Sequence, residues 1–320
     1  MAQLLINTRV ARKEKVANTI MRLELTPIIG NTMTPFEAGS HIELHLPNGI
    51  TRSYSLVNYG DVDRYAIAVG LSETSKGGSR YIFDNLAAGQ VVTSGLPRNN
   101  FPFIEKAVHS VFIAGGIGIT PIVSMIRRAE KIRASWELHY ATRTRAASAL
   151  YALLADCVFS GDPRVHEHFD DERGRPLNLG EILAQCRANA DAYCCGPVSM
   201  LEAYEAATAA NGFRPERVHL ESFTSRLTPA NTGGFTVILQ RQGREVEVPP
   251  GLTILEALLV AGVDAPFSCR EGICGSCEVR VIEGTPDHRD AVLSETERAS
   301  NQSLMICCSG CRSDRLVLDL

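Results

Sequence analysis

Residues 269–277 read Cys-Arg-Glu-Gly-Ile-Cys-Gly-Ser-Cys, and a further cysteine follows at Cys307. The spacing Cys-x4-Cys-x2-Cys with one distant cysteine is the plant-type pattern that holds a [2Fe–2S] cluster through four thiolates. Glycines within the segment let the backbone wrap closely, so that its N–H groups can point at sulfur. A zinc ribbon would use two Cys-x2-Cys pairs instead. The pattern therefore predicts Cys269, Cys274, Cys277 and Cys307 as cluster ligands, with structural thiols as the alternative.

The composition limits the class of protein. A chain of 320 residues is long enough for two or three domains, each with its own core. A net charge of −4 provides no basic surface for nucleic acid, and no apolar run resembles a signal peptide or a membrane span. The ten cysteines do not resemble a secreted disulfide framework in a chain of this size. We therefore expect a cytoplasmic protein that does not bind membranes.

The alternation of strands and helices predicts three domains. Residues 1–103 contain short alternating strands separated by turns, which indicates a small antiparallel β-barrel or sandwich. Residues 104–223 alternate strands with helices, which indicates an α/β domain with a parallel sheet. Residues 224–234 are polar with Gly and Pro and are interpreted as a linker. Residues 235–320 predict a smaller unit of strands and a helix around the cluster loop.

Capping residues predict where several helices begin. Thr120 is expected to cap a helix that Pro121 opens. Asn178, with Glu181, makes an approximate capping box for a later helix. A further helix is expected around residues 253–261.

Two motifs of the first domain together predict a flavin phosphate site. Arg52-Ser53-Tyr54-Ser55 can place a guanidinium on a phosphate, a phenol ring against a flavin and a hydroxyl near the ring edge. Lys76-Gly77-Gly78-Ser79 adds a positive charge and a backbone nest suited to phosphate oxygens. Each motif alone also fits an ordinary strand or hairpin turn, but their combination in this order favours the flavin.

Motifs of the second domain predict a nucleotide site. Residues 115–121, Gly-Gly-Ile-Gly-Ile-Thr-Pro, lie between a strand and a helix, where a pyrophosphate can approach the backbone. They differ from the GxGxxG fingerprint, so a glycine turn without a ligand is the alternative. Cys194-Cys195-Gly196-Pro197 ends a later strand of the same sheet, where parallel sheets bind ligands. Phe223, in Glu221-Ser222-Phe223, belongs either to a core or to a flavin face.

The remaining charged and titratable residues are expected to have structural rather than catalytic roles. Asp287-His288-Arg289-Asp290 lies between cluster ligands and is interpreted as a salt-bridged loop rather than an acid/base site. The other histidines carry no ligand spacing and are interpreted as structural. Catalysis is therefore expected to rest on cofactors that the chain orients, with no catalytic side chain.

In this order the motifs resemble the phthalate dioxygenase reductase family, the single-chain reductase components of Rieske-type aromatic-ring oxygenases. The resemblance covers essentially the whole chain and is carried by RSYS, GGS, GGIGITP, YCCGP, ESF, CREGICGSC, DHRD and LVLDL. It implies an FMN-binding β-barrel in residues 1–103, an NAD-binding α/β domain in 104–223 and a β-grasp-like plant-type ferredoxin domain in 235–320. It also implies hydride transfer from NADH to FMN, and single-electron transfer through the [2Fe–2S] cluster from a monomeric reductase to its oxygenase.

The resemblance also implies individual contacts. The residues implied to contact FMN are Arg52, Ser53, Tyr54, Ser55, Ala68, Val69, Gly70, Lys76, Gly77, Gly78, Ser79, Thr120 and Phe223. The residues implied to frame the nicotinamide nucleotide are Gly115, Gly116, Gly118, Cys195, Gly196 and Pro197.

Three positions depart from the family pattern. Gly70 stands where the family has a lysine, and Cys308 lies directly beside the expected ligand Cys307. Thr144 replaces an acidic residue and Arg145 adds a positive charge, which weakens the expected rejection of NADPH. Two alternatives stay open: an FAD-containing NAD(P)H reductase for another acceptor such as a P450, and a redox sensor that uses the cluster without turnover.

Overall fold

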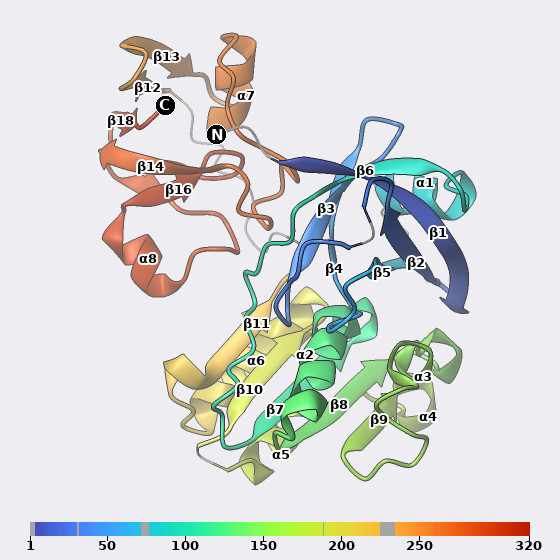
Figure 1. The fold of residues 1–320 in the computed structure, drawn as a ribbon. Coiled ribbons are helices and arrows are strands. Elements are labelled where there is room, and N and C mark those ends of the chain that lie inside the picture. The colour runs from blue at the N-terminus through green and yellow to red at the C-terminus, as the bar shows by residue number, and fades with distance from the viewer. Residues whose placement is uncertain (1–3, 31, 72–76, 188, 225–233) are drawn as a thin grey trace. The chain divides into compact units, whose positions relative to one another are not determined.

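The computed structural model describes residues 4–30, 32–71, 77–187, 189–224 and 234–320. The chain divides into two compact units, Met1–Glu221 and Ser222–Leu320, and each unit has its own sheets (Figure 1). Lys76 and all but the two end residues of the predicted linker lie outside the described residues.

The first sheet of the N-terminal unit is antiparallel and closes on itself. Its strand order is β4-β3-β6-β1-β2-β5. The strands are β1 (Leu5–Ala17), β2 (Ile20–Pro27), β3 (His41–His45), β4 (Thr51–Ser55), β5 (Tyr65–Gly70) and β6 (Val91–Gly95). A bridge between Leu56, just after β4, and Ile67 in β5 joins the two ends of this order. Helix α1 (Gly78–Asp84) adds Ile82 to the aliphatic core. The predicted antiparallel β-barrel is confirmed.

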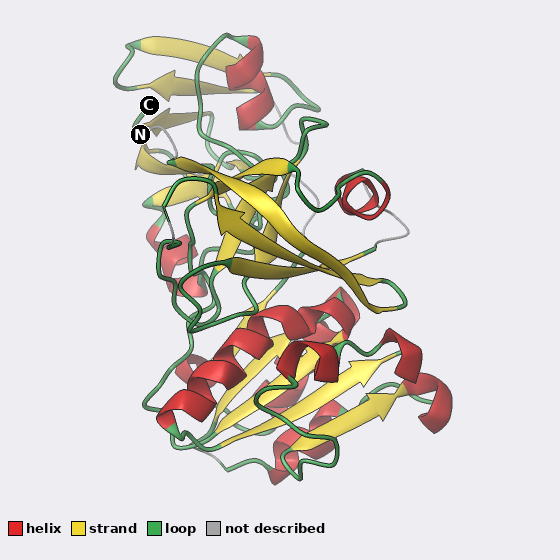
Figure 2. Ribbon diagram, turned by 45° about the vertical axis from the view of Figure 1, so that its right-hand side comes forward, coloured by secondary structure: helices red, strands yellow, loops and turns green. Residues whose placement is uncertain are grey.

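The second sheet of this unit is parallel throughout, in the order β11-β10-β7-β8-β9. Its strands are β7 (Ser110–Gly115), β8 (Trp136–Thr142), β9 (Val165–Phe169), β10 (Asp191–Cys195) and β11 (Val218–Glu221). Its helices are α2 (Ile119–Ile132), α3 (Leu150–Leu154), α4 (Asp170–Arg173), α5 (Leu179–Gln185) and α6 (Val198–Ala210), with 3-10 turns η1 (Gly116–Gly118), η2 (Arg145–Ala147) and η3 (Pro215–Arg217). Helices lie on both faces of the sheet (Figure 2). The predicted α/β domain is confirmed.

The start of α2 differs from the sequence prediction. The helix begins at Ile119, and the hydroxyl of Thr120 donates to the Ile117 carbonyl at 3.0 Å rather than capping the helix. Because η1 runs directly into α2, the backbone is already helical at Gly118. Pro121 then lies in the first turn, where its missing N–H costs no helical hydrogen bond. The prediction that Thr120 caps and Pro121 opens this helix was therefore wrong.

The C-terminal unit is a mixed sheet with one main helix. The strand order is β13-β12-β18-β14-β16, and β12 and β18 run parallel. The strands are β12 (Phe235–Leu239), β13 (Arg244–Val248), β14 (Glu278–Glu283), β16 (Ser303–Met305) and β18 (Arg315–Leu318), with a separate pair β15 (Pro286–Asp287) and β17 (Gly310–Cys311). Helix α7 (Ile254–Val260) packs its buried residues into the sheet's core, and α8 (Glu295–Ser300) follows later. This arrangement is the predicted β-grasp-like α+β fold.

Two predicted helix starts are confirmed by their caps. The side chain of Asn178 accepts a hydrogen bond from the Glu181 N–H at the start of α5. Thr253 and Glu256 form a reciprocal capping box at the start of α7. Both caps satisfy N–H groups that have no partner within their own helix.

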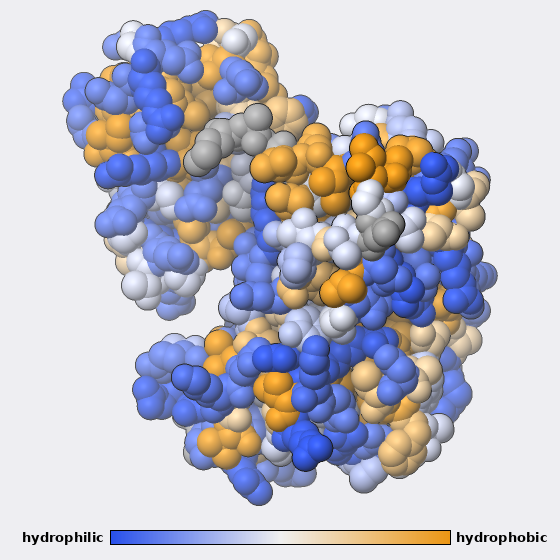
Figure 3. All heavy atoms as spheres, in the orientation of Figure 1, coloured by the Kyte–Doolittle hydropathy of each residue, from blue (hydrophilic) through white to orange (hydrophobic). Residues whose placement is uncertain are grey.

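The surface mixes polar and apolar residues. In Figure 3 hydrophilic residues predominate on the visible face, with apolar side chains gathered in smaller patches between them. Among the helices that the structure describes, none is long and apolar enough to cross a membrane.

Candidate functional site

Glycines at the carboxyl edge of the parallel sheet allow two loops to touch. A Cβ on Gly118, in the turn after β7, would lie 2.2 Å from the Cys195 carbonyl oxygen at the end of β10. A Cβ on Gly196 would lie 2.7 Å from Met200 Sδ. Gly116 instead has a φ of +54° and nothing within 4 Å of where its Cβ would be. Ligands of parallel sheets bind beyond the carboxyl ends of the strands. At this edge the two loops are in contact at Gly118, and Gly116 leaves room for a ligand.

The barrel strand β5 meets the same turn. A Cβ on Gly70 would lie 3.2 Å from Ile117 Cβ, so a longer side chain at Gly70 would meet Ile117. A second link joins the barrel to α2, where the Gly39 N–H donates to Ser124 Oγ at 2.8 Å. The predicted flavin strand at residues 68–70 and the predicted nucleotide turn at residues 115–118 therefore lie side by side.

The two motifs expected to hold the flavin phosphate also converge. A Cβ on Gly78 would lie 2.9 Å from Cγ of Arg52, so the arginine side chain runs along this glycine. Burial raises the pKa of Tyr54 and keeps its phenol neutral. Within the described part of the chain, the buried Ser53 Oγ has no hydrogen-bond partner. A buried hydroxyl without a partner costs free energy unless something bonds to it. These residues fit a bound group with polar atoms, as a flavin is.

Glu221 is a site residue that the sequence analysis quoted only as part of a motif. It pairs in register with Cys195 at the carboxyl edge of the parallel sheet. Its Oε2 is buried with no hydrogen-bond partner among the described residues, and burial raises its pKa to about 8. Burial likewise raises the pKa of Cys195. The edge thus carries an uncharged carboxyl beside an uncharged thiol at neutral pH. Glu221 could be recognised as a site residue only from the fold, because the fold makes it the last residue of the edge strand β11.

Two residues of the predicted flavin site lie differently from the others. The Thr120 hydroxyl is already engaged with the Ile117 carbonyl. Phe223 belongs to the C-terminal unit, where it is half-buried. Their contacts with a flavin stay predictions.

The four predicted cluster cysteines converge in the C-terminal unit, and all four are buried. Cys269 is hydrogen-bonded to the sulfurs of Cys274 and Cys307, and Cys307 also reaches Cys277. The Glu271 N–H donates to Cys269 Sγ at 3.3 Å. Hydrogen bonds from Cys269 and Cys277 lower the pKa of Cys307, which favours its thiolate. Four clustered sulfurs with backbone N–H groups directed at them fit a [2Fe–2S] cluster.

The position of Cys308 differs from that of Cys307. Cys308 touches Cys307 but neither Cys269 nor Cys277 among the sulfur contacts of the described residues. Its Sγ lies 3.7 Å from the Met305 carbonyl. The structure therefore brings Cys307, rather than Cys308, to the other three cysteines.

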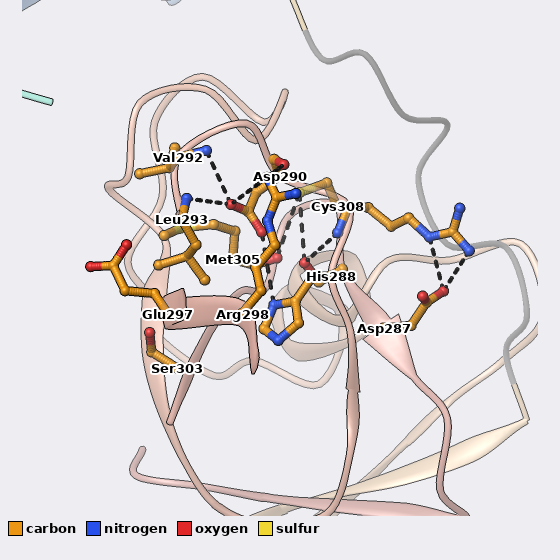
Figure 4. A network of polar contacts seen from close by, with 12 residues as sticks. Asp287, His288, Asp290, Val292, Leu293, Glu297, Arg298, Ser303, Met305 and Cys308 are labelled. Carbon is orange, nitrogen blue, oxygen red and sulfur yellow. Dashed lines mark hydrogen bonds and ion pairs between the residues drawn. The ribbon is translucent and has the colours of Figure 1, made fainter. Parts of the chain in front are cut away.

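A buried carboxylate supports the cluster loop from behind. Asp290 Oδ2 accepts hydrogen bonds from the backbone N–H groups of Val292 at 3.0 Å and Leu293 at 2.7 Å (Figure 4). The adjacent Ala291 N–H donates to the carbonyl of Gly272 at 2.8 Å. Because Gly272 lies within the cluster loop, these bonds tie the loop to a fixed turn.

Asp287 anchors the start of the same turn. Its carboxylate pairs with Arg289 at 2.7 Å and Arg312 at 3.1 Å. Burial opposes the effect, but the two arginines hold the pKa of Asp287 below its usual value. The interpretation of residues 287–290 as a salt-bridged loop is confirmed.

Known proteins are similar to this chain over almost its full length. The family model of the 2Fe-2S iron-sulfur cluster binding domain matches residues 237–312. Tetrachlorobenzoquinone reductase of Sphingobium chlorophenolicum is 47% identical, with 98% of each chain covered. Phthalate dioxygenase reductase of Burkholderia cepacia is 38% identical over 98% of this chain and 97% of its own. The chain belongs to the phthalate dioxygenase reductase family.

A solved structure of phthalate dioxygenase reductase agrees with this reductase in fold. It covers 99% of this chain and 98% of its own, with 36% sequence identity and a TM-score of 0.71. This chain is therefore an iron–sulfur oxidoreductase whose flavin-type barrel and nucleotide-type α/β domain precede a [2Fe–2S] domain.

The reductase has an ion pair next to Thr144, the position at which the family pattern has an acidic residue. Arg145, just beyond the end of β8, makes two hydrogen bonds to the Glu172 carboxylate, at 3.1 and 3.0 Å. Its guanidinium also lies over the Phe169 ring, 4.2 Å from the centroid. Arg145 is thus held by an acid of α4, which the sequence analysis did not identify.

The crowding at Gly272 predicts a defect in cluster binding. Gly272 has a φ of +69°, and a Cβ there would lie 2.5 Å from Cys308 Sγ. We expect Gly272→Ala to destabilise the C-terminal unit by the left-handed backbone strain of about 1–2 kcal/mol plus about 1–3 kcal/mol of overpacking, and to lower the iron bound per chain. Iron content and denaturant unfolding measure the two effects.

Gly262→Ala is the matched control, because Gly262 also has a positive φ, of +73°, but nothing within 4 Å of where its Cβ would be. Gly262→Ala should lose only the stability that corresponds to the backbone strain, and it should bind as much iron as the wild type. Equal iron loss in both variants would show that the contact with Cys308 does not matter.

Proposed function

We propose that this reductase takes hydride from NADH and delivers single electrons to a Rieske-type aromatic-ring oxygenase, using FMN and a [2Fe–2S] cluster. The observation that carries the proposal is the contact of β5 with η1 at Gly70 and Ile117. It supports a flavin on the barrel within reach of a nicotinamide at the sheet edge, in a chain that also carries a four-cysteine site. When bound, the flavin takes up two electrons together and the cluster passes them on one at a time.

In this proposal the barrel binds the flavin and orients it toward the sheet edge. Arg52, with the backbone of Gly77 and Gly78, holds the phosphate, and Lys76 adds positive charge. Ser53 donates its hydroxyl to a polar atom of the flavin, because that hydroxyl has no partner within the described residues. Residues 68–70 present a flat backbone edge to the ring. A single phosphate on Arg52 is the feature that favours FMN over FAD.

At the sheet edge the turn around Gly116 receives the nucleotide, and Cys195 to Pro197 border the nicotinamide. Glu221 acts here as a positioning residue. With its pKa raised to about 8, the carboxyl is protonated at neutral pH and can donate a hydrogen bond to the carboxamide of the nicotinamide. Exclusion of NADPH is assigned to the carboxylates of α4, which neutralise Arg145 and repel a 2′-phosphate.

The acceptor is proposed from the relatives. Similarity to phthalate dioxygenase reductase supports an oxygenase as the partner that accepts the electrons. We propose that the reductase is a monomer and that it works in the cytoplasm. A second candidate function, reduction of a quinone, is favoured by the 47% identity to tetrachlorobenzoquinone reductase.

The identity of the flavin tests the first part of the proposal. Flavin released by heat from the purified holoenzyme should co-migrate with FMN, because the proposal places a single flavin phosphate, at Arg52 and the backbone of Gly77 and Gly78. A dominant FAD peak would contradict the proposed phosphate site, even if NADH oxidation continued.

The cluster assignment predicts different outcomes for two adjacent cysteines. Cys307→Ser should lose the visible absorption of the cluster, since Cys307 reaches Cys269 and Cys277. Cys308→Ser should keep the cluster and serves as the matched control. In both variants NADH should still bleach the flavin, because the proposed flavin and nucleotide residues other than Phe223 lie in the other unit. If Cys308→Ser lost the cluster and Cys307→Ser kept it, Cys308 rather than Cys307 would be the fourth ligand.

The same cluster-free variant separates the two acceptors. In Cys307→Ser, the rate of electron transfer to a one-electron acceptor such as cytochrome c should decrease, because the cluster is lost. Retained reduction of a quinone by Cys307→Ser would favour the second candidate function.

Nucleotide choice tests the role of Glu172. We expect kcat/KM to favour NADH by roughly 10–150-fold, the range of a single-contact effect. Glu172→Gln removes the charge that neutralises Arg145 and should narrow this preference by about tenfold. Glu216→Gln breaks a comparable exposed pair with Arg214 and should leave the preference unchanged. An unchanged preference in Glu172→Gln would show that another residue excludes the 2′-phosphate.

A further inference from the structure

One face of strand β8 carries titratable side chains where an apolar surface is expected. Trp136, Leu138 and Tyr140 are buried on the other face. Glu137 and His139 alternate with them and are only half-buried. Strands of a parallel sheet that helices cover on both faces are normally apolar on both. These polar side chains therefore need a separate physical reason.

His166 joins the two residues from the neighbouring strand. It is the register partner of His139 in the parallel β8–β9 ladder, and the two imidazole rings stack with centroids 4.7 Å apart. Glu137 Oε1 lies 3.6 Å from His139 Nε2. One ligand atom from each of Glu137, His139 and His166 lies within 4.8 Å of the other two. The ladder thus gathers three potential metal ligands that are distant in sequence.

The hydrogen bonds of this cluster are incomplete. His139 Nε2 is buried and makes no hydrogen bond of ordinary length within the described part of the chain, although Glu137 Oε1 lies 3.6 Å from it. A buried ring nitrogen without a partner is unfavourable unless something binds it.

Neighbouring side chains border the cluster. His109 Nε2 lies 3.9 Å from Glu137 Oε2, and its Nδ1 lies 2.8 Å from Ser135 Oγ. Cys186 Sγ lies 3.9 Å from Glu137 Oε1 and donates to the Ile182 carbonyl at 3.3 Å. Both are positioned to support Glu137 from outside the three-residue set, as residues around metal ligands commonly do.

We propose that Glu137, His139 and His166 form a binding site for a divalent transition metal, with Zn²⁺ as the best match. Two imidazoles and one carboxylate are a ligand set that Zn²⁺ uses, with bonds of about 2.0–2.2 Å and a fourth position open to water. Side-chain rotations have to draw the three ligand atoms together around the metal, and His166 is exposed. The remaining position faces solvent at this side chain.

The site is separate from the redox chemistry. Glu137 and His139 lie in the first half of β8, whereas the nucleotide turn lies beyond the carboxyl ends of the strands. A metal here would join β8 to β9 and stabilise the folded nucleotide domain by binding to it in preference to the unfolded chain.

Zinc titration of the intact holoenzyme tests the site. After exposure to Zn²⁺ and removal of free metal, we expect one zinc per chain in addition to undiminished cluster iron, measured by elemental analysis. X-ray absorption at the zinc edge should show nitrogen and oxygen neighbours. A shell dominated by sulfur would place the zinc on cysteines and overturn the proposal.

Variants assign the zinc to this cluster. His139→Gln and His166→Gln should each weaken zinc affinity by more than the ~10–100-fold typical of losing a supporting neighbour. His45→Gln, in the barrel, should not change it. Flavin content, iron content and NADH oxidation should stay at the wild-type level in all three, which shows that they fold. Zinc affinity unchanged in both ligand variants, or no zinc retained by the wild type, would refute the site.

Discussion

The close approach of two backbone turns is the constraint on which the flavin–nucleotide site depends. Gly118 lies against the Cys195 carbonyl with no room for a Cβ, so the turn after β7 and the end of β10 are fixed relative to each other. Since η1 passes directly into α2, this contact also sets where the helix begins. The barrel can then meet Ile117 through Gly70. Added side-chain volume at Gly118 or Gly70 would separate the surfaces that must face one another.

Both candidate sites contain buried polar groups. In the cluster unit Asp290 Oδ2 accepts from two backbone N–H groups, while Oδ1 of the same carboxylate is buried without a hydrogen-bond partner among the described residues. Asp287 is paired with two arginines. Such satisfied groups make a rigid support. In the flavin–nucleotide site Ser53 Oγ and Glu221 Oε2 are buried without hydrogen-bond partners among the described residues. Unsatisfied polar atoms are costly in the protein alone, and their cost is offset when a ligand supplies the missing hydrogen bonds.

The same reasoning connects the flavin site with the histidine cluster of β8 and β9. His139 Nε2 is another buried polar atom without a partner in the described chain, but it lies away from the nucleotide edge and beside a carboxylate. Imidazole nitrogens and a carboxylate that converge favour a metal cation, whereas a lone hydroxyl in a barrel favours an organic ligand. The chemistry of the unsatisfied atoms therefore separates a metal site from a cofactor site within one unit.

Features that depend on neighbours along the chain could be predicted from the sequence. The Cys269–Cys277 spacing and the cap at Asn178 are local patterns, because each needs only a few consecutive residues. The order of barrel, α/β and ferredoxin domains followed from the succession of such patterns along the chain. The start of α2 was mispredicted although it too is local, since a 3-10 turn before the helix changes which N–H groups need a cap.

Contacts between residues distant in sequence became visible in the tertiary structure. It placed Glu221 beside Cys195, paired Arg145 with Glu172 and stacked His139 on His166. Each of these pairs is set by strand register or by the packing of a loop, and a shift of one residue in register turns every side chain of a strand to the opposite face. Composition and spacing carry no information about that register, so these contacts could not be derived from the sequence.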